Sequence, residues 1–186
     1  MKKILTLLLF LSISVHSFAS YILIPMDAEG QKNHLKAYGL TYWTLEKQLK
    51  VNWLLNYRGG SFLLPDSESI QRECQIRGIS YEVLSDSKTE EILNLIASPS
   101  QNMEAVILEK APTIAVYSPK ANLPWDDAVT MALTYAEIPY DVIYDEEVLN
   151  HALLLYDWLH LHHDVFTGQF GKFYGNYTSA DGYIIE

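Results

Sequence analysis

Three histidines and an aspartate lie close together near the C-terminal part of the chain, and they are the residues best suited to chemistry. His160, His162, His163 and Asp164 end a short apolar segment that is typical of a β-strand. In a strand, His160 and His162 project to the same side, so their imidazoles are spaced to hold one divalent metal ion such as zinc. His163 and Asp164 would add further ligands where the strand ends. The alternative is a set of polar groups at a strand end, hydrogen-bonded to neighbouring loops.

Two other segments are weaker candidates for ligand binding. Asp27 and Glu29 follow the first predicted strand, where they would contribute carboxylates to a site at the strand ends. Arg58-Gly59-Gly60-Ser61 also follows a strand, and a glycine-rich turn of this kind can bind an anion through its backbone N–H groups. A tight β-hairpin explains the same residues more simply, and we favour it. The segment lacks the full glycine pattern of a dinucleotide site and the Gly-Lys-Ser/Thr ending of a P-loop.

Cys74 is the only cysteine, so the chain cannot form an intramolecular disulfide. The residue lies within a predicted helix, at helical spacing from Ile70, and not at the glycine-flanked turn that a nucleophile elbow requires. We therefore expect Cys74 to be packed in the core rather than to act as a nucleophile.

Alternating strands and helices are expected to position these groups. The predicted strands cover residues 21–25, 51–57, 61–64, 79–84, 103–108 and 114–117, with a last strand ending in the histidines. The predicted helices cover residues 31–49, 66–77, 89–97 and 125–137, and a strand follows the last of them. Residues 78–86 and 137–145 resemble each other, which indicates one strand–helix pattern used twice. The alternation predicts an α/β fold: a Rossmann-like three-layer sandwich with a mostly parallel sheet, truncated at its C-terminus because no closing helix follows.

Residues 1–19 have the pattern of a signal peptide. Lys2 and Lys3 precede an apolar run that is shorter than the ~20 residues needed to span a bilayer. Ser17-Phe18-Ala19 places small residues where a signal peptidase reads them, so we expect cleavage near Ala19-Ser20 and a periplasmic or secreted protein. No segment of the mature chain is expected to span a membrane.

The composition of the chain excludes some partners. The sequence carries 13 Lys and Arg against 23 Asp and Glu, a formal net charge of −10. Loss of the two leader lysines leaves 11 basic residues and a net charge near −12. Such a balance disfavours nucleic acid and anionic lipid, which bind clusters of basic residues. We expect two regions after the leader, an N-terminal α/β region over 20–110 and a second α/β domain that begins at 111.

Three segments resemble a family of exported bacterial proteins that is labelled "asparagine synthetase B". They are residues 55–62, 124–130 and 156–163, and the likeness extends to about residue 177. The unit from Pro112 onward is similar to the opening of a class I glutamine amidotransferase-like domain. The chain lacks the motifs of glutamine-dependent asparagine synthesis, because no cysteine begins the mature chain and no Ser-Gly-Gly-x-Asp-Ser loop is present.

These observations predict an exported α/β protein that binds a small polar ligand at the carboxyl ends of its strands. The ligand-binding residues would be His160, His162, His163 and Asp164, with weaker contributions from Asp27 and Glu29. One alternative is a metal-dependent hydrolase that uses the same histidine cluster, with a metal-bound water as the nucleophile. The other is a non-catalytic module that contacts an envelope protein through the aromatic residues of 166–177.

Overall fold

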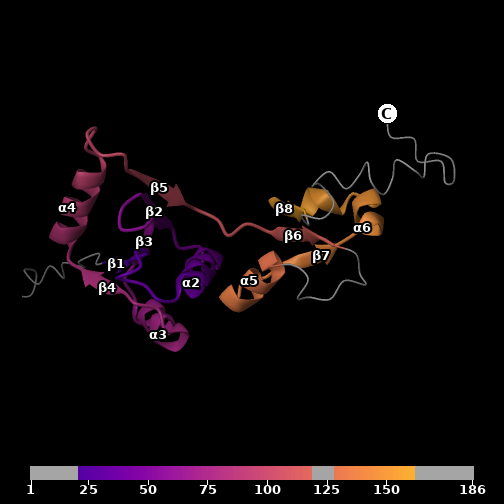
Figure 1. The fold of residues 1–186 in the computed structure, drawn as a ribbon, viewed down its shortest axis with the longest axis horizontal. Helices are drawn as coiled ribbons and strands as arrows, with labels where there is room; N and C mark the ends of the chain where they lie inside the picture. The colour runs from indigo at the N-terminus through magenta and orange to yellow at the C-terminus, as the bar shows by residue number, and fades with distance from the viewer. Residues whose placement is uncertain (1–20, 119–127, 162–186) are drawn as a thin grey trace, which may run out of the picture. The chain divides into compact units, whose positions relative to one another are not determined.

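A computed structural model describes residues 21–118 and 128–161, and Figure 1 shows their elements. The predicted signal peptide and the three residues His162, His163 and Asp164 lie outside this part of the chain. The chain forms two compact units. The described part of unit 1 covers residues 21–32 and 49–108, and that of unit 2 covers residues 33–48, 109–118 and 128–161.

Unit 1 is built on a five-stranded sheet. The strands in chain order are β1 (Tyr21–Ile24), β2 (Val51–Leu55), β3 (Ser61–Pro65), β4 (Glu82–Leu84) and β5 (Glu104–Leu108). They pair in the order β4-β1-β3-β2-β5, and every pair is antiparallel. The predicted Rossmann-like sandwich with a mostly parallel sheet is therefore wrong.

The connections explain why this sheet is antiparallel. Two helices of the chain, α2 (His34–Glu46) and α3 (Glu68–Arg77), connect β1 to β2 and β3 to β4. Each connection leaves a gap of one strand, which β3 fills in the first case and β1 in the second. This β-α-β-β-α-β order with interleaved strands is the ferredoxin-like arrangement. A further helix, α4 (Asp86–Ile96), then adds β5 beyond β2.

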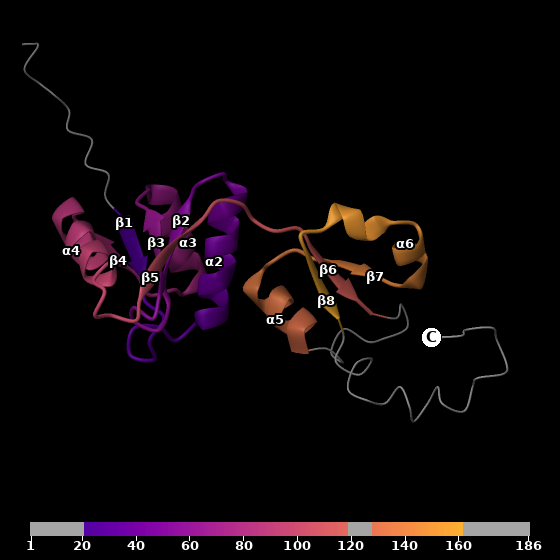
Figure 2. The same ribbon diagram turned by 90° about the horizontal axis from the view of Figure 1, so that it is seen from above.

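Apolar side chains on alternating strand positions form the core of unit 1. Leu23, Leu54 and Leu63 pack against Ile92 and Ile96 of α4. Residues on the other face of the sheet are equally buried. Figure 2 shows α4 and α3 on opposite sides of the sheet, so both faces are covered.

Local sequence signals fix the ends of the two helices of unit 1. Ser67 and Ser85 cap α3 and α4, because each hydroxyl accepts a backbone N–H three residues later. Gly78 ends α3 in the left-handed region at φ 65°. Cys74 is fully buried on α3, so the prediction of core packing is confirmed.

Unit 2 contains a small parallel sheet. Its strands are β6 (Ile114–Tyr117), β7 (Asp141–Ile143) and β8 (Trp158–Leu161), paired in the order β7-β6-β8. Its other elements are α5 (Ala128–Ala136), α6 (Asp145–Leu149), the 3₁₀ helix η2 (Ala152–Leu155) and the helix α2 described above. The parallel pairing that the sequence predicts for the whole chain is found among the described residues only in these three strands.

Within unit 2, helix α2 packs closely on α5. A Cβ added to Gly39 would lie 1.7 Å from the carbonyl oxygen of Ala136, so only glycine permits this approach. Lys36 forms an ion pair with Glu137 at 2.5 Å. The Tyr42 hydroxyl donates to the Pro112 carbonyl at 2.9 Å, and burial is the main cause that raises the pKa of Tyr42.

Candidate functional site

The carboxyl end of the parallel sheet is the best candidate for a binding site. The register aligns Tyr117 of β6 with Ile143 of β7 and with Leu161 of β8, so all three strands end together. In Figures 1 and 2, α5 lies on one side of this sheet, and α6 and η2 lie on the other. In chain order, β6 is thus followed by β7, which pairs on one side of it, and then by β8, which pairs on its other side. Open α/β sheets bind their ligands outside the carboxyl ends of the strands at which strand order reverses in this way.

Polar groups from β6 and from the start of α6 meet at this end of the sheet. The Tyr117 hydroxyl donates to Oδ1 of Asp145 at 2.5 Å. The rings of Tyr117 and Tyr144 lie 5.2 Å apart and are tilted by 34°. The backbone N–H of Ser118 donates to the carbonyl of Ile143, which ties the end of β6 to the end of β7. Aromatic and carboxylate groups therefore lie together at the carboxyl end of this sheet.

His160 lies in β8, one residue before the carboxyl end of the sheet. It is half-buried and lies level with Val116 of the central strand. His162, His163 and Asp164 lie outside the described residues, so the predicted histidine cluster stays a prediction. Among the residues that the structure describes, no group of three His, Cys, Asp or Glu side chains is placed to hold a metal ion.

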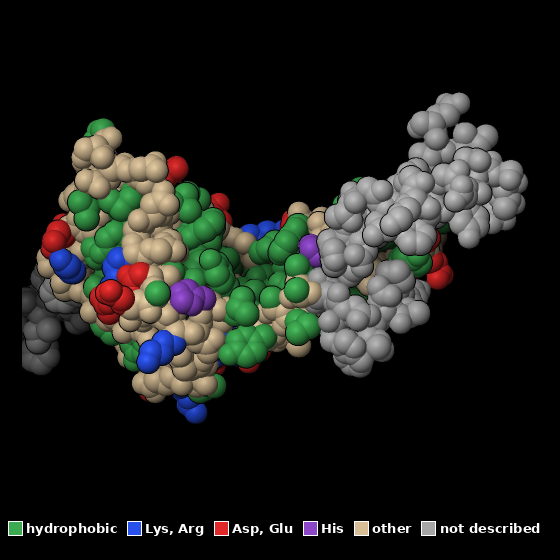
Figure 3. Space-filling view, viewed as in Figure 1, with side chains coloured by type: hydrophobic (Ala, Val, Ile, Leu, Met, Phe, Trp, Pro, Cys, Tyr) green, Lys and Arg blue, Asp and Glu red, His purple; other side chains and the backbone are tan. Residues whose placement is uncertain are grey.

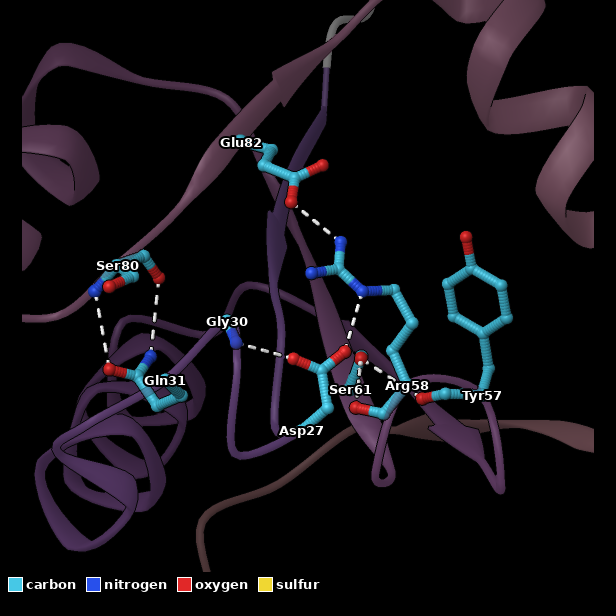
Figure 4. Close-up of polar contacts among 8 residues, drawn as sticks. All are labelled: Asp27, Gly30, Gln31, Tyr57, Arg58, Ser61, Ser80 and Glu82. Atoms are coloured by element: carbon cyan, nitrogen blue, oxygen red, sulfur yellow. Dashed lines mark hydrogen bonds and ion pairs between the residues drawn. The ribbon is translucent and has the colours of Figure 1, made fainter.

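Asp27 belongs to unit 1, where it holds a loop together (Figure 4). Its Oδ1 accepts the Gly30 N–H at 2.6 Å, and its Oδ2 accepts Nε of Arg58 at 2.7 Å. Nη1 of Arg58 donates to Glu82 at 2.6 Å. The hydrogen bonds to Asp27 and then to Glu82 raise the pKa of Arg58 above its ordinary value. Through Arg58 of the β2–β3 turn, Asp27 and Glu82 thus connect the loop after β1 with β4.

The second carboxylate predicted after the first strand, Glu29, is exposed in the same loop. Asp27 and Glu29 belong to unit 1 and His160 to unit 2. The structure supports a local structural role for Asp27, and the ligand-binding role of the two carboxylates stays a prediction.

The predicted anion-binding turn is a β-hairpin whose donors point inward. The backbone N–H groups of Gly60 and Ser61 both donate to the Tyr57 carbonyl at 3.0 Å. The Ser61 hydroxyl donates to the carbonyls of Tyr57 and Arg58, also at 3.0 Å. The guanidinium of Arg58 is already bound by two carboxylates. The β2–β3 pairing confirms the hairpin, and these donors are not directed at an external anion.

Sequence reasoning missed a polar network at the amino end of the parallel sheet. Asp157 accepts hydrogen bonds from Nζ of Lys110 at 2.8 Å and from the N–H and hydroxyl of Thr113. The hydrogen bond to Lys110 is the first cause that lowers the pKa of Asp157 to about 2. Lys110 and Thr113 are separated from Asp157 by more than forty residues, so no local pattern predicts the contact.

A shallow groove lies beside β5 in unit 1. It has a volume of about 370 Å³ and is lined by residues of α4, of the following loop and of β5 itself, including Leu93, Ile96, Met103 and Ala105. Among the described residues that line the groove, Glu104 is the only one with a titratable side chain.

The surface and the helices give two further observations. Figure 3 shows basic side chains scattered singly on the face that it views, among apolar and acidic ones. No helix in the described ranges has the length and apolar character that crossing a bilayer requires.

Comparisons of the chain with models of known protein families, with curated proteins and with solved structures found no match.

Proposed function

We propose that this chain is an exported protein that binds a small polar ligand at the carboxyl end of the β7-β6-β8 sheet. One observation carries the proposal: β6 is followed in sequence by the strand on one side of it and then by the strand on its other side. This reversal is the position at which open α/β sheets bind their ligands.

The side chains at this position favour a ligand with hydrogen-bond donors. The carboxylate of Asp145 and the hydroxyl of Tyr117 already form one hydrogen bond there, and His160 lies on the neighbouring strand. An amino acid or an amide offers N–H donors to such groups. The resemblance of the region from Pro112 onward to a class I amidotransferase-like domain, and of 156–163 to the family labelled "asparagine synthetase B", supports the same choice of ligand.

Two tyrosines provide a matched test of the binding position. Tyr117 donates to Asp145 at the carboxyl end of the sheet, and Tyr156 donates to Asp141 at the amino end, at 3.0 Å. We would titrate ¹⁵N-labelled protein with glutamine, asparagine and glutamate and follow the amide signals of both ends. The proposal expects shifts at Ser118 and Tyr144, and weaker binding in Tyr117→Phe than in Tyr156→Phe.

Three results would argue against this function. These are no response to any of the ligands, shifts confined to the amino end, or equal affinities for the two tyrosine variants. Export is tested separately, by the mass of the protein recovered outside the cytoplasm. A mature chain that begins at Ser20 would support the proposed cleavage, and an intact leader would refute it.

A further inference from the structure

The outer strand β5 lies at one edge of the five-stranded sheet of unit 1. It pairs with β2 on one side, and on its other side it has no partner strand in the described part of the chain. Figure 1 shows β5 at one margin of the sheet and β4 at the other. Natural proteins protect such edges with Lys, Pro or a bulge. Ala105, Val106 and Ile107, at the centre of β5, carry none of these.

The apolar side chain of Ile107 lies at this edge. Its relative exposure is 57%, which is high for an isoleucine in the middle of a strand. Ala105 pairs with Leu54, and Leu54 packs against α4, so Ala105 faces α4. Ile107 lies two residues further along and therefore points to the same side of the sheet. The groove lined by Ala105 and Met103 opens on that side.

We propose that β5 pairs in antiparallel fashion with β5 of a second copy of this chain, so that the two five-stranded sheets become continuous. The strand is self-complementary when Val106 lies on the two-fold axis. Glu104, the only charged residue of the strand, is then opposite Leu108 of the second copy and not opposite itself. This register pairs all five residues of the strand.

The same register fills the groove. Ile107 of the second copy is then the direct cross-strand neighbour of Ala105, beside the hollow between α4 and β5. Because a two-fold interface is isologous, each copy receives the isoleucine of the other. The second copy thus supplies both the missing backbone partners of β5 and an apolar side chain for the groove.

A charge at the edge tests the dimer. We would measure the molar mass of the purified protein by sedimentation over about 1–500 µM, because a small interface gives a weak, transient association. The wild-type protein is expected to dimerise, and Ile107→Lys is expected to weaken the dimer by about tenfold or more. Val83→Lys is the matched control, since Val83 is 54% exposed on β4, the opposite outer strand.

A cysteine at the axis tests the register. Val106→Cys brings two thiols opposite each other and is expected to give a disulfide-linked dimer on mild oxidation, whereas Ala105→Cys is not. The native Cys74 is buried and does not interfere. A monomer at every concentration, a dimer that Ile107→Lys leaves intact, loss of the dimer in Val83→Lys, or equal cross-linking of both cysteine variants would overturn the proposal. Circular dichroism of each variant verifies that it is folded.

Discussion

Replacing Gly59 with alanine tests how closely the β2–β3 turn approaches the loop after β1. Gly59 has a φ of 79°, in the left-handed region. A Cβ at this position would lie 2.4 Å from the carbonyl oxygen of Met26 and 2.7 Å from the backbone nitrogen of Asp27. These are backbone atoms, so the contact cannot be relieved by rotating a side chain, and the loop itself must move.

The expected loss of stability has two parts. The left-handed conformation costs a residue with a side chain about 1–2 kcal/mol. Moving the loop breaks the 3.0 Å hydrogen bond from the Met26 N–H to the Arg58 carbonyl. Met26 is buried, and leaving a buried N–H without a partner costs about 1–3 kcal/mol. We therefore expect Gly59→Ala to lower the free energy of unfolding by about 2–5 kcal/mol.

Gly78 provides the control, because it has a φ of 65° and no atom within 4 Å of an added Cβ. Gly78→Ala therefore has only the conformational cost of about 1–2 kcal/mol. Urea unfolding followed by circular dichroism compares the two variants. A difference of ~2 kcal/mol corresponds to roughly 1 M in the midpoint at an m-value near 2 kcal/mol/M. Equal midpoints for the two variants would refute the close approach.

Three further predictions concern other parts of the molecule. Gly39→Ala forces α2 away from the Ala136 carbonyl, and urea unfolding should show a loss of about 2 kcal/mol or more, whereas an unchanged midpoint would exclude the tight helix contact. Burial raises the pKa of the Cys74 thiol to about 12, so a thiol reagent at pH 8 should modify the unfolded but not the native protein. The pKa of Asp157 in the folded protein is lowered to about 2. The ionised Asp157 carboxylate therefore stabilises the fold at pH values above its ordinary pKa, and this stabilisation is lost as the pH falls from about 4 to 2. An NMR titration should show this low midpoint, and Lys110→Ala should raise it; a midpoint that the substitution does not change would contradict the assigned cause.

Local signals in the sequence predicted most of the elements but not how the strands pair. Residues 78–86 and 137–145 resemble each other. In each segment the first residue has a positive φ, a three-residue strand follows, and a helix then begins. Yet β4 joins its sheet in antiparallel fashion, and β7 joins in parallel fashion. Whether a strand pairs in parallel or antiparallel fashion depends on which strand lies beside it in the sheet. That neighbour comes from a distant part of the sequence, so local signals do not reveal it. A sequence that alternates strands and helices is therefore compatible with both sheets.

The same limit applies to the candidate site. The position of His160 near the carboxyl end of a strand follows from a short apolar run, and the structure has it there. The contact of Tyr117 with Asp145 joins residues 28 positions apart, and it depends on the register of β6 and β7. Asp27 was predicted as a ligand-binding group because it follows a strand. Its hydrogen bond to Gly30 is local, whereas its hydrogen bond to Arg58 depends on the antiparallel pairing of β1 with β3.

The membership of α2 in unit 2 has a consequence for dissecting the protein. A cut at the linker after β5 would separate residues 33–48 from the helix that they pack against. A recombinant fragment of residues 111–186 would expose the side of α5 at which Gly39 approaches Ala136 and Lys36 lies over the ring of Tyr135. Split-gene expression of 20–110 and 111–186 in one cell should therefore give fragment complementation, with the second piece soluble only when the first is co-expressed.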